Sequence, residues 1–249
     1  MKKYLTIFIV FALLGIVAIL FRVGSRSMTP SSGQNATVTA ENKFAPLNQT
    51  DAMIHLPEVT LDGAMSLEKS ITLRRSVRSY ADKPLSMREL SQLLWSAQGI
   101  TSERGFRTAP SAGATFPLEM FVVVNHVAGL TRGIYHYRPH SHVLELVRSE
   151  DVSEDLFRAC LSQSMILKGG AVLVFAAVLE RTTARYGERG IRYVYNEVGH
   201  ASQNVHLQAA ALDLGTVVIG AYRDDEVEDI LKLGDSYRVL YLMPVGKLR

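Results

Sequence analysis

The sequence contains one cysteine, Cys160, in 249 residues, which excludes an internal disulfide. That cysteine lies in SEDLFRACLSQ, residues 153–163, whose amphipathic pattern predicts a helix with a packed rather than a reactive thiol. The net charge is also small, at +3 with a pI near 9.0, and the basic residues form no long stripe along the sequence. We therefore expect no nucleic-acid partner, and a small anionic ligand suits this charge balance better.

The chain shows no internal repeat, and its 47% hydrophobic positions suffice for one substantial domain. Residues 5–21 are apolar apart from Thr6 and are flanked by Lys2, Lys3 and Arg22, which predicts a membrane segment within residues 1–24. The run is intermediate in length between a signal-peptide core and a spanning helix. An uncleaved transmembrane anchor is favoured because no A-x-A cleavage pattern follows, and a cleaved signal peptide stays the alternative.

The region after the membrane segment divides into a linker and a domain. Residues 25–50 are rich in Ser, Thr, Asn, Gln and Pro without a hydrophobic period, so they are expected to form a flexible linker. Residues 51–249 form the predicted folded domain. Positive charges flank the membrane segment on both sides, and the usual route of an N-terminal anchor places the domain outside the cytoplasm.

Helix and strand patterns interleave along the domain. Ser86 and Glu89 have capping-box spacing and Gly99 follows, which predicts a helix between them. Strands are predicted from EMFVVV, GIYHY, VLELV, AVLVFAAVL, TVVIG and RVLYLMPVG, with a hairpin turn at RPHSH. A long helix is predicted over 194–212. This alternation predicts an α+β or α/β sandwich.

The segment TLRRSVRSY, residues 72–80, gathers three guanidinium groups around a hydroxyl: Arg74, Arg75 and Arg78 around Ser76. Arg presents a planar fork of donors that binds phosphate oxygens in pairs, and a Ser hydroxyl adds one further hydrogen bond. The segment is therefore a candidate phosphate site. A solvated basic loop is the alternative interpretation.

A second candidate is TAPSAGATFP, residues 108–117, in which small side chains surround Gly113 before a strand. Small side chains let backbone groups approach a flat ring closely, as binding of a heteroaromatic edge requires. An ordinary turn explains the same composition.

Three histidines in HYRPHSH, His136, His140 and His142, have loose spacing and no adjacent Cys or acidic partner. We therefore expect no metal site there, but exposed histidines at a hairpin tip. A serine acyltransferase of the penicillin-binding type is a further alternative. S-x-x-K occurs at Ser66–Lys69 and S-x-N at 202–204, but the third element of that family, K-T-G, is absent.

Five segments in order, LRRSVRSY, APSAGATFPLEMFVVV, GIYHY, NEVGHASQNVHLQAAALDLGTVVIGAY and MPVGK, resemble the nitroreductase family of FMN oxidoreductases, specifically its SagB/ThcOx-type dehydrogenase branch. The resemblance covers about residues 67–247. It implies an α+β three-layer sandwich, with a mainly antiparallel central sheet flanked by helices. It also implies a homodimer with two interfacial FMN sites, NAD(P)H as electron donor and a small-molecule acceptor.

The resemblance assigns a flavin role to three groups of residues. The phosphate would be held by Arg74, Ser76 and Arg78, with Arg75 nearby and Lys247 or Arg249 approaching from the C-terminus. The ring or ribityl chain would be lined by Pro110, Ser111, Ala112 and Gly113. The flavin face would lie along Val218, Ile219, Gly220 and Ala221.

The azoline-oxidising members of that branch carry a Lys-Tyr pair ahead of the long helix, where this chain has Arg185 and Tyr186. These two are the candidate catalytic residues. Arg cannot give up a proton near neutral pH, so it cannot serve as a general base, and azoline oxidation is not expected. An ion pair is the alternative role for Arg185.

Two questions stay open at the level of the sequence. The fold could persist in an anchored flavin-binding module without turnover. An extracytoplasmic flavoprotein would also have to acquire FMN outside the cytoplasm, which keeps a cytoplasmic orientation open.

Overall fold

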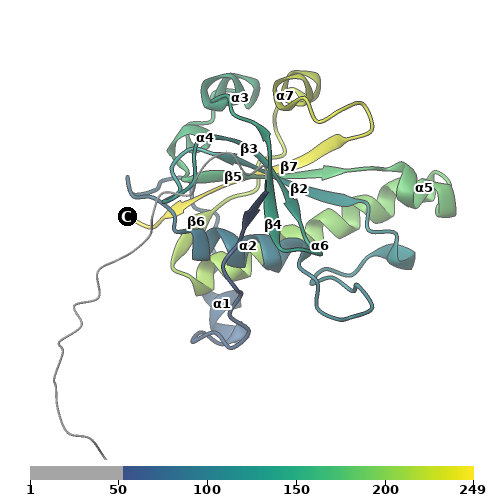
Figure 1. Ribbon diagram of the computed structural model, residues 1–249, viewed down its shortest axis with the longest axis horizontal. Helices are drawn as coiled ribbons and strands as arrows, with labels where there is room; N and C mark the ends of the chain where they lie inside the picture. The colour runs from purple at the N-terminus through teal and green to yellow at the C-terminus, as the bar shows by residue number, and fades with distance from the viewer. Residues whose placement is uncertain (1–52) are drawn as a thin grey trace, which may run out of the picture. The chain divides into compact units, whose positions relative to one another are not determined.

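The computed structural model describes residues 53–249 (Figure 1). The predicted membrane segment, residues 1–24, and the predicted linker, residues 25–50, lie outside the described residues. Within 53–249, no helix is both long enough and apolar enough to cross a membrane.

The centre of the domain is a seven-stranded sheet in the order β1-β4-β3-β2-β5-β7-β6, and every neighbouring pair is antiparallel. The strands are β1 Met53–His55, β2 Leu118–Val124, β3 Gly133–Arg138, β4 Val143–Arg148, β5 Ala171–Ala177, β6 Leu214–Thr216 and β7 Arg238–Lys247. All seven residues of β5 are buried, which confirms the prediction of a strand covered on both faces. The hairpin of β3 and β4 is also confirmed.

Helices cover both faces of the sheet, so the domain has three layers (Figure 1). One layer holds α1 Leu67–Leu73, α2 Met87–Gln98 and α6 Arg189–Ala211; the other holds α3 Ser153–Ala159, α4 Met165–Lys168 and α7 Asp224–Leu231. A 3-10 turn, η1 Ala112–Ala114, precedes β2, and α5 Glu180–Tyr186 follows β5. Along β2, Met120 and Val122 pack toward α2 and α6, whereas Phe121 and Val123 pack toward α3 and α7. The α+β sandwich is confirmed.

Helix α2 begins and ends where its sequence predicts. The Ser86 Oγ accepts from the Glu89 backbone N–H at 3.2 Å, and the Glu89 carboxylate accepts from the Ser86 N–H at 2.9 Å. Gly99 is the C-cap residue with extended backbone, and glycine is required there because a Cβ would lie 2.1 Å from the Trp95 ring.

Two predicted boundaries differ. Helix α6 starts at Arg189 rather than Val194, so it is longer than predicted. The strand predicted over 216–220 is replaced by β6, which covers Leu214–Thr216. It ends at Thr216 because the next residue, Val217, faces Pro244, which has no N–H to donate. The Pro244 carbonyl accepts instead from the Thr216 hydroxyl at 3.0 Å.

Cys160 is fully buried directly after α3, as predicted. Burial raises the pKa of its thiol to about 12, so the thiolate is not populated near neutral pH.

Candidate active site

The arginine segment lies along the free side of edge strand β6. Ser76 pairs with Thr216, and the Val77 N–H donates to the Thr216 carbonyl at 2.9 Å. Further along, the Ala81 N–H donates to the Lys247 carbonyl at 2.9 Å. The structure therefore brings the arginine segment beside the C-terminal residues, as the resemblance implies.

The side chains of this segment are available to an anion to different degrees. Within residues 53–249, the guanidinium groups of Arg74 and Arg78 form no ion pair, and Ser76 is exposed. The Arg75 guanidinium instead donates to the carbonyls of Thr72 and Arg74, at 2.9 and 2.7 Å, at the end of α1. Two guanidinium groups and one hydroxyl thus fit a phosphate, and Arg75 is engaged with the backbone.

The two C-terminal cations are both partly engaged. Lys247 forms an ion pair with Glu89 of α2, and the Arg249 Nε donates to the Tyr80 carbonyl at 3.2 Å. Burial alone would raise the pKa of Glu89, but hydrogen bonds from Lys247 and Ser86 outweigh it and hold that pKa below its usual range. An anion at this edge would therefore compete with Glu89 for Lys247.

His206 of α6 lies under the arginine segment and was not identified from the sequence. It is 8% exposed, and no described residue pairs with its Nδ1. Burial, together with the charge of Arg74, lowers the pKa of His206 to about 4. The imidazole is therefore neutral at physiological pH.

The strip from Val218 to Ala221 continues from β6 along the same edge. Ile219 exchanges two backbone hydrogen bonds with Leu242, at 2.8 and 3.0 Å, and is buried. Gly220 and Ala221 are exposed, and the Gln163 amide donates to the Ala221 carbonyl at 2.8 Å. Gly220 and Ala221 thus offer exposed backbone in the segment that follows β6, and Gln163 is a contact that the sequence did not reveal.

The loop Pro110 to Gly113 leads into strained backbone. Gly113 has a φ of +60°, and Ala114 and Phe116 have φ of +53° and +45°, in the left-handed region that non-glycine residues rarely adopt. Such strain is held in place by surrounding contacts and is concentrated at functional sites.

Arg185 and Tyr186, in the last turn of α5, supply those contacts. The Arg185 Nη1 donates to the Gly113 carbonyl at 3.0 Å, and the Arg185 guanidinium lies 5.5 Å from the Tyr186 ring centroid. A Cβ on Gly113 would lie 2.5 Å from the Tyr186 hydroxyl. The predicted catalytic pair and the predicted ring-binding loop therefore form one group.

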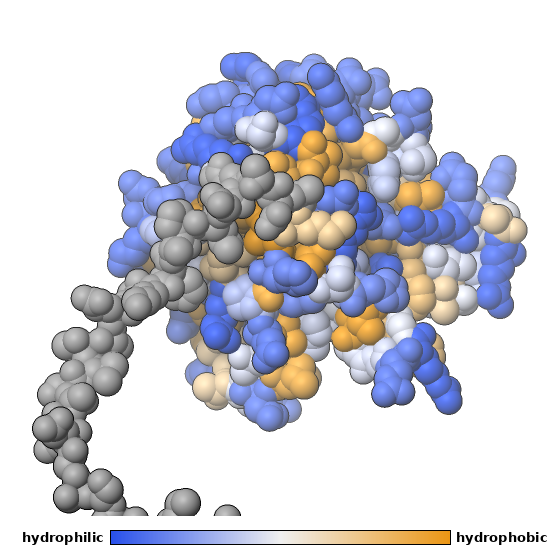
Figure 2. Space-filling model, in the orientation of Figure 1, coloured by the Kyte–Doolittle hydropathy of each residue, from blue (hydrophilic) through white to orange (hydrophobic). Residues whose placement is uncertain are grey.

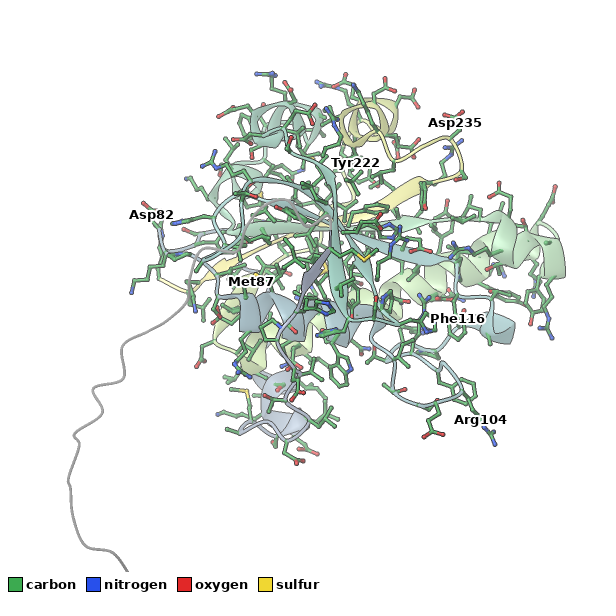
Figure 3. The ribbon with its side chains drawn as sticks, in the orientation of Figure 1. Asp82, Met87, Arg104, Phe116, Tyr222 and Asp235 are labelled. Atoms are coloured by element: carbon green, nitrogen blue, oxygen red, sulfur yellow. The ribbon has the colours of Figure 1, made fainter. Side chains whose placement is uncertain are left out.

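This second group lies far from the arginine segment within one chain. Helix α5 directly precedes α6, so Arg185 and Tyr186 lie near the N-terminal end of α6, whereas Arg74 lies near His206 toward its C-terminal end, in a helix about 35 Å long. In Figure 3, Phe116, after the loop, and Asp82, after the arginine segment, lie on opposite sides of the domain.

The predicted exposure of the three histidines is wrong for two of them. His136 is 3% exposed and pairs with Glu119 at 2.8 Å, because both side chains point toward the α3 side of adjacent strands. His142 is partly buried and contacts the Ser91 and Tyr137 hydroxyls, at 2.8 and 2.9 Å. His140 alone is exposed.

The serine motifs have structural roles. The Ser66 Oγ caps α1 by accepting from the Lys69 N–H at 3.2 Å. Ser202 donates to the Gly199 carbonyl at 3.1 Å, and the Asn204 amide donates to the Thr108 carbonyl at 3.2 Å. These contacts give the acyltransferase alternative no support.

Comparison with known proteins identifies the family of this chain. The sequence profile of the nitroreductase family matches residues 71–247. A protein of Methanocaldococcus jannaschii with a nitroreductase name is 48% identical over 194 residues, which cover 78% of this chain and 96% of that protein. A solved structure from Ralstonia eutropha, also named as a nitroreductase, is 26% identical with a TM-score of 0.69, and the match covers 82% of this chain and 92% of that one.

The chain belongs to the nitroreductase family. The trifolitoxin operon protein TfxC of Rhizobium leguminosarum bv. trifolii is 28% identical over 204 residues, 76% of this chain and 55% of that protein. This relative supports the assignment to the SagB-type dehydrogenase branch. The chain therefore spans about half the length of TfxC. A solved structure from Anabaena variabilis is 31% identical with a TM-score of 0.66. That match covers 74% of this chain and 38% of the Anabaena chain.

Proposed function

We propose that this protein is an FMN-dependent oxidoreductase that passes a hydride from NAD(P)H to a small acceptor. The observation that carries the proposal is that Arg74 and Arg78 form no ion pair with any residue of 53–249 and flank Ser76, which pairs with edge strand β6. Two uncompensated cations on an ordered edge suit a phosphate better than a structural role.

The residues of this chain supply binding and positioning, while bound FMN would supply the hydride-accepting and hydride-donating centre. Arg74, Ser76 and Arg78 would hold the phosphate. The exposed backbone at Gly220 would lie against the flavin, and the Gln163 contact to Ala221 keeps that strip in place. Arg185 would orient an anionic or carbonyl-bearing acceptor, and the Tyr186 hydroxyl would donate a proton to the reduced product.

A homodimer would unite the two groups of site residues. The exposed face of α6 carries Ile191 and Tyr195, 37% and 56% exposed, and a Cβ on Gly199 would meet nothing within 4 Å. Leu67 and Ile71 of α1 are also exposed apolar side chains, and orange side chains are visible in Figure 2 toward the lower end where Figure 1 draws α1. A second copy packed here would bring its loop and its Arg185 and Tyr186 to the arginine segment of the first.

The experiment is to purify the protein, release any chromophore by denaturation and identify it by chromatography. We expect noncovalent FMN, bleached by NADH or NADPH under anaerobic conditions. A colourless protein that also fails to bind added FMN would refute the proposal. FMN that binds but is not reduced by either donor would indicate a flavin-binding module without turnover with these donors.

We also propose that residues 5–21 remain attached and anchor the protein in a membrane, with the domain outside the cytoplasm. Support comes from the length of the apolar run and the absence of a strong cleavage pattern. Alkaline carbonate extraction should leave the full-length chain in the membrane pellet, whereas a shortened soluble chain would indicate a cleaved signal peptide. A reporter fused to the C-terminus determines the orientation.

A further inference from the structure

The strained turn before β2 is held by more of α5 than Arg185. The Arg181 Nη1 donates to the Phe116 carbonyl at 3.0 Å. The hydroxyls of Thr182 and Thr115 are hydrogen-bonded at 2.8 Å, and Thr182 is buried. The proposed hydride transfer uses neither Arg181 nor Thr182, so their contacts to the turn need a separate explanation.

Together with Arg185, these residues form one row of contacts along α5. The Arg185 Nη1 donates to the Gly113 carbonyl at 3.0 Å. A spacing of i, i+1 and i+4 places the three side chains within one sector of the helix surface. Gly113 and Phe116 both have positive φ, and such backbone persists only where surrounding contacts determine it. The two arginines thus hold the carbonyls of two left-handed residues.

The position of Arg181 is in turn set by the sheet. The same Nη1 atom donates to the Glu119 Oε1 of β2 at 2.6 Å, and the Glu119 side chain is 12% exposed. The other carboxylate oxygen, Oε2, accepts from the His136 Nε2 at 2.8 Å. The His136 ring stacks on Phe121 with the ring centroids 4.1 Å apart. Both oxygens of Glu119 are therefore engaged, and its side chain cannot turn away from Arg181 without losing a contact.

Glu119 is ionised in this setting. Burial alone would raise the pKa of Glu119, but hydrogen bonds from His136 and Arg181 outweigh burial and hold that pKa below its usual range. Solvent screens part of the attraction, because the Arg181 side chain is 39% exposed. A hydrogen bond between charged groups is still stronger than one between neutral groups, so Glu119 fixes the Arg181 guanidinium.

We propose that Arg181 is a positioning residue that locks α5 to the turn of residues 112–116, with Glu119 holding Arg181 in place. The Pro110–Gly113 loop and the Arg185–Tyr186 pair then keep a fixed position relative to each other. The consequence for the reaction rests on the proposed function: Arg181 acts on acceptor binding through Arg185, without touching the acceptor.

The first test does not depend on flavin chemistry. Amide hydrogen exchange is measured on the full-length protein for the Thr115 and Phe116 N–H groups, which donate to the Ala112 carbonyl at 3.3 Å and to the Ser111 Oγ at 2.9 Å. Arg181→Met keeps an apolar stem but removes the donors. We expect both amides to exchange about tenfold faster or more in this variant, because the hold on the turn is weaker.

Arg132→Met is the matched control. Arg132 also joins a carboxylate to a backbone carbonyl, since it pairs with Asp151 and its Nε donates to the Asn125 carbonyl at 3.1 Å. Asn125 follows the last residue of β2, whereas Glu119 is near the first. The control should therefore leave exchange in the turn unchanged. Wild-type exchange in Arg181→Met, or an equal increase in Arg132→Met, overturns the proposal.

Glu119→Gln provides a second variant if Arg181→Met fails to fold. It leaves the donors of Arg181 in place but removes the charge that fixes them. Exchange of the two turn amides should be faster than in the wild type but slower than in Arg181→Met, because the hydrogen bond to Phe116 can still form. Wild-type exchange in Glu119→Gln contradicts the proposed hold on Arg181.

The second test asks whether Arg181 acts through Arg185. The KM for a quinone acceptor is measured at saturating NAD(P)H for Arg181→Met, Arg185→Ala and the double variant. Arg181→Met should raise KM in the wild-type background and have little further effect in the Arg185→Ala background. A KM that Arg181→Met leaves unchanged in the wild-type background, or raises equally in both, overturns the action through Arg185.

The two tests separate this inference from the proposed function. If the wild type neither binds FMN nor reduces any acceptor, the proposed function is wrong. The exchange measurement then still decides whether Arg181 locks α5 to the turn.

Discussion

The proposed phosphate site consists of side chains beside the β6 edge, and substitution of Arg74 or Arg78 tests it most directly. Charge-assisted hydrogen bonds contribute about 1.5–3 kcal/mol each, so Arg74→Ala or Arg78→Ala should weaken FMN binding by about tenfold or more. Fluorescence titration with FMN measures the effect. Arg158→Ala, which removes an exposed ion pair on α3, is the matched control and should bind normally. If both site variants are folded and bind with wild-type affinity, the phosphate lies elsewhere.

The pKa of His206 provides a second test of phosphate binding beside Arg74, and this test leaves the site unmutated. Its pKa is held near 4 by burial and by Arg74. A bound phosphate would offset the charge of Arg74, so FMN binding should raise the His206 pKa. An NMR titration, with the signal assigned from His206→Gln, measures this shift. An unchanged pKa in the FMN-saturated protein would contradict a phosphate beside Arg74.

Substitutions of Arg185 and Tyr186 test the proposed binding and protonation of the acceptor. If Arg185 orients the acceptor, Arg185→Lys should retain much of the activity and Arg185→Ala should raise KM. Tyr186→Phe removes one hydroxyl, so a large loss of kcat at unchanged FMN affinity would mark it as a proton donor. Steady-state reduction of quinones and nitroaromatics by NAD(P)H provides the assay. If alanine is tolerated at both positions with every acceptor, the pair only supports the loop through Gly113.

At the scale of elements, α6 is expected to form the contact between copies. A glycine inside a helix destabilises it by about 0.8–1.0 kcal/mol relative to alanine, and Gly199 has open space around it in the single chain. Gly199→Leu should therefore leave or raise the stability of the monomer but weaken the dimer by tenfold or more, because a partner helix would clash with the new side chain. Sedimentation equilibrium measures the dimer constant. Asp229→Leu on α7 is the control, and an unchanged dimer in Gly199→Leu would exclude α6 from the interface.

The elements that the sequence predicted are those whose signal is local. Helix α2 has its own capping box, and β5 is a continuous apolar run. Helix α7 was missed because it has only eight residues, so its apolar positions Val227, Ile230 and Leu231 are too few to show a helical period. Helix α1 was missed for a related reason, since its seven residues span only two turns.

The candidate site was predictable to a similar extent. Contiguous motifs identified the arginine segment and the loop, but the pairing of Lys247 with Glu89 joins residues 158 positions apart, which no local pattern reveals. His206 was missed because a polar residue on a long helix resembles a solvated one until the packing of that helix is known. The sequence could not show that the arginine segment and the Arg185–Tyr186 group are separated within one chain, because that separation depends on the direction in which α6 runs across the sheet.

In the proposed dimer, two copies of the chain share each flavin site. In the proposed homodimer, isologous packing through α6 would place the loop of each copy at the arginine segment of the other. A chain with Arg74→Ala and Arg78→Ala would then have a defective phosphate half. A chain with Gly113→Ala would have a defective loop half, because its φ is +60° and the new Cβ would meet Tyr186.

Co-expression of these two variants tests the shared site most directly. Each variant alone should contain little FMN, because every site in its homodimer has one defective half. Random pairing makes about half of the dimers mixed, each with one intact site, so the co-expressed protein should recover about a quarter of the wild-type FMN content and activity. FMN content that equals the average of the two separate variants would contradict the shared site.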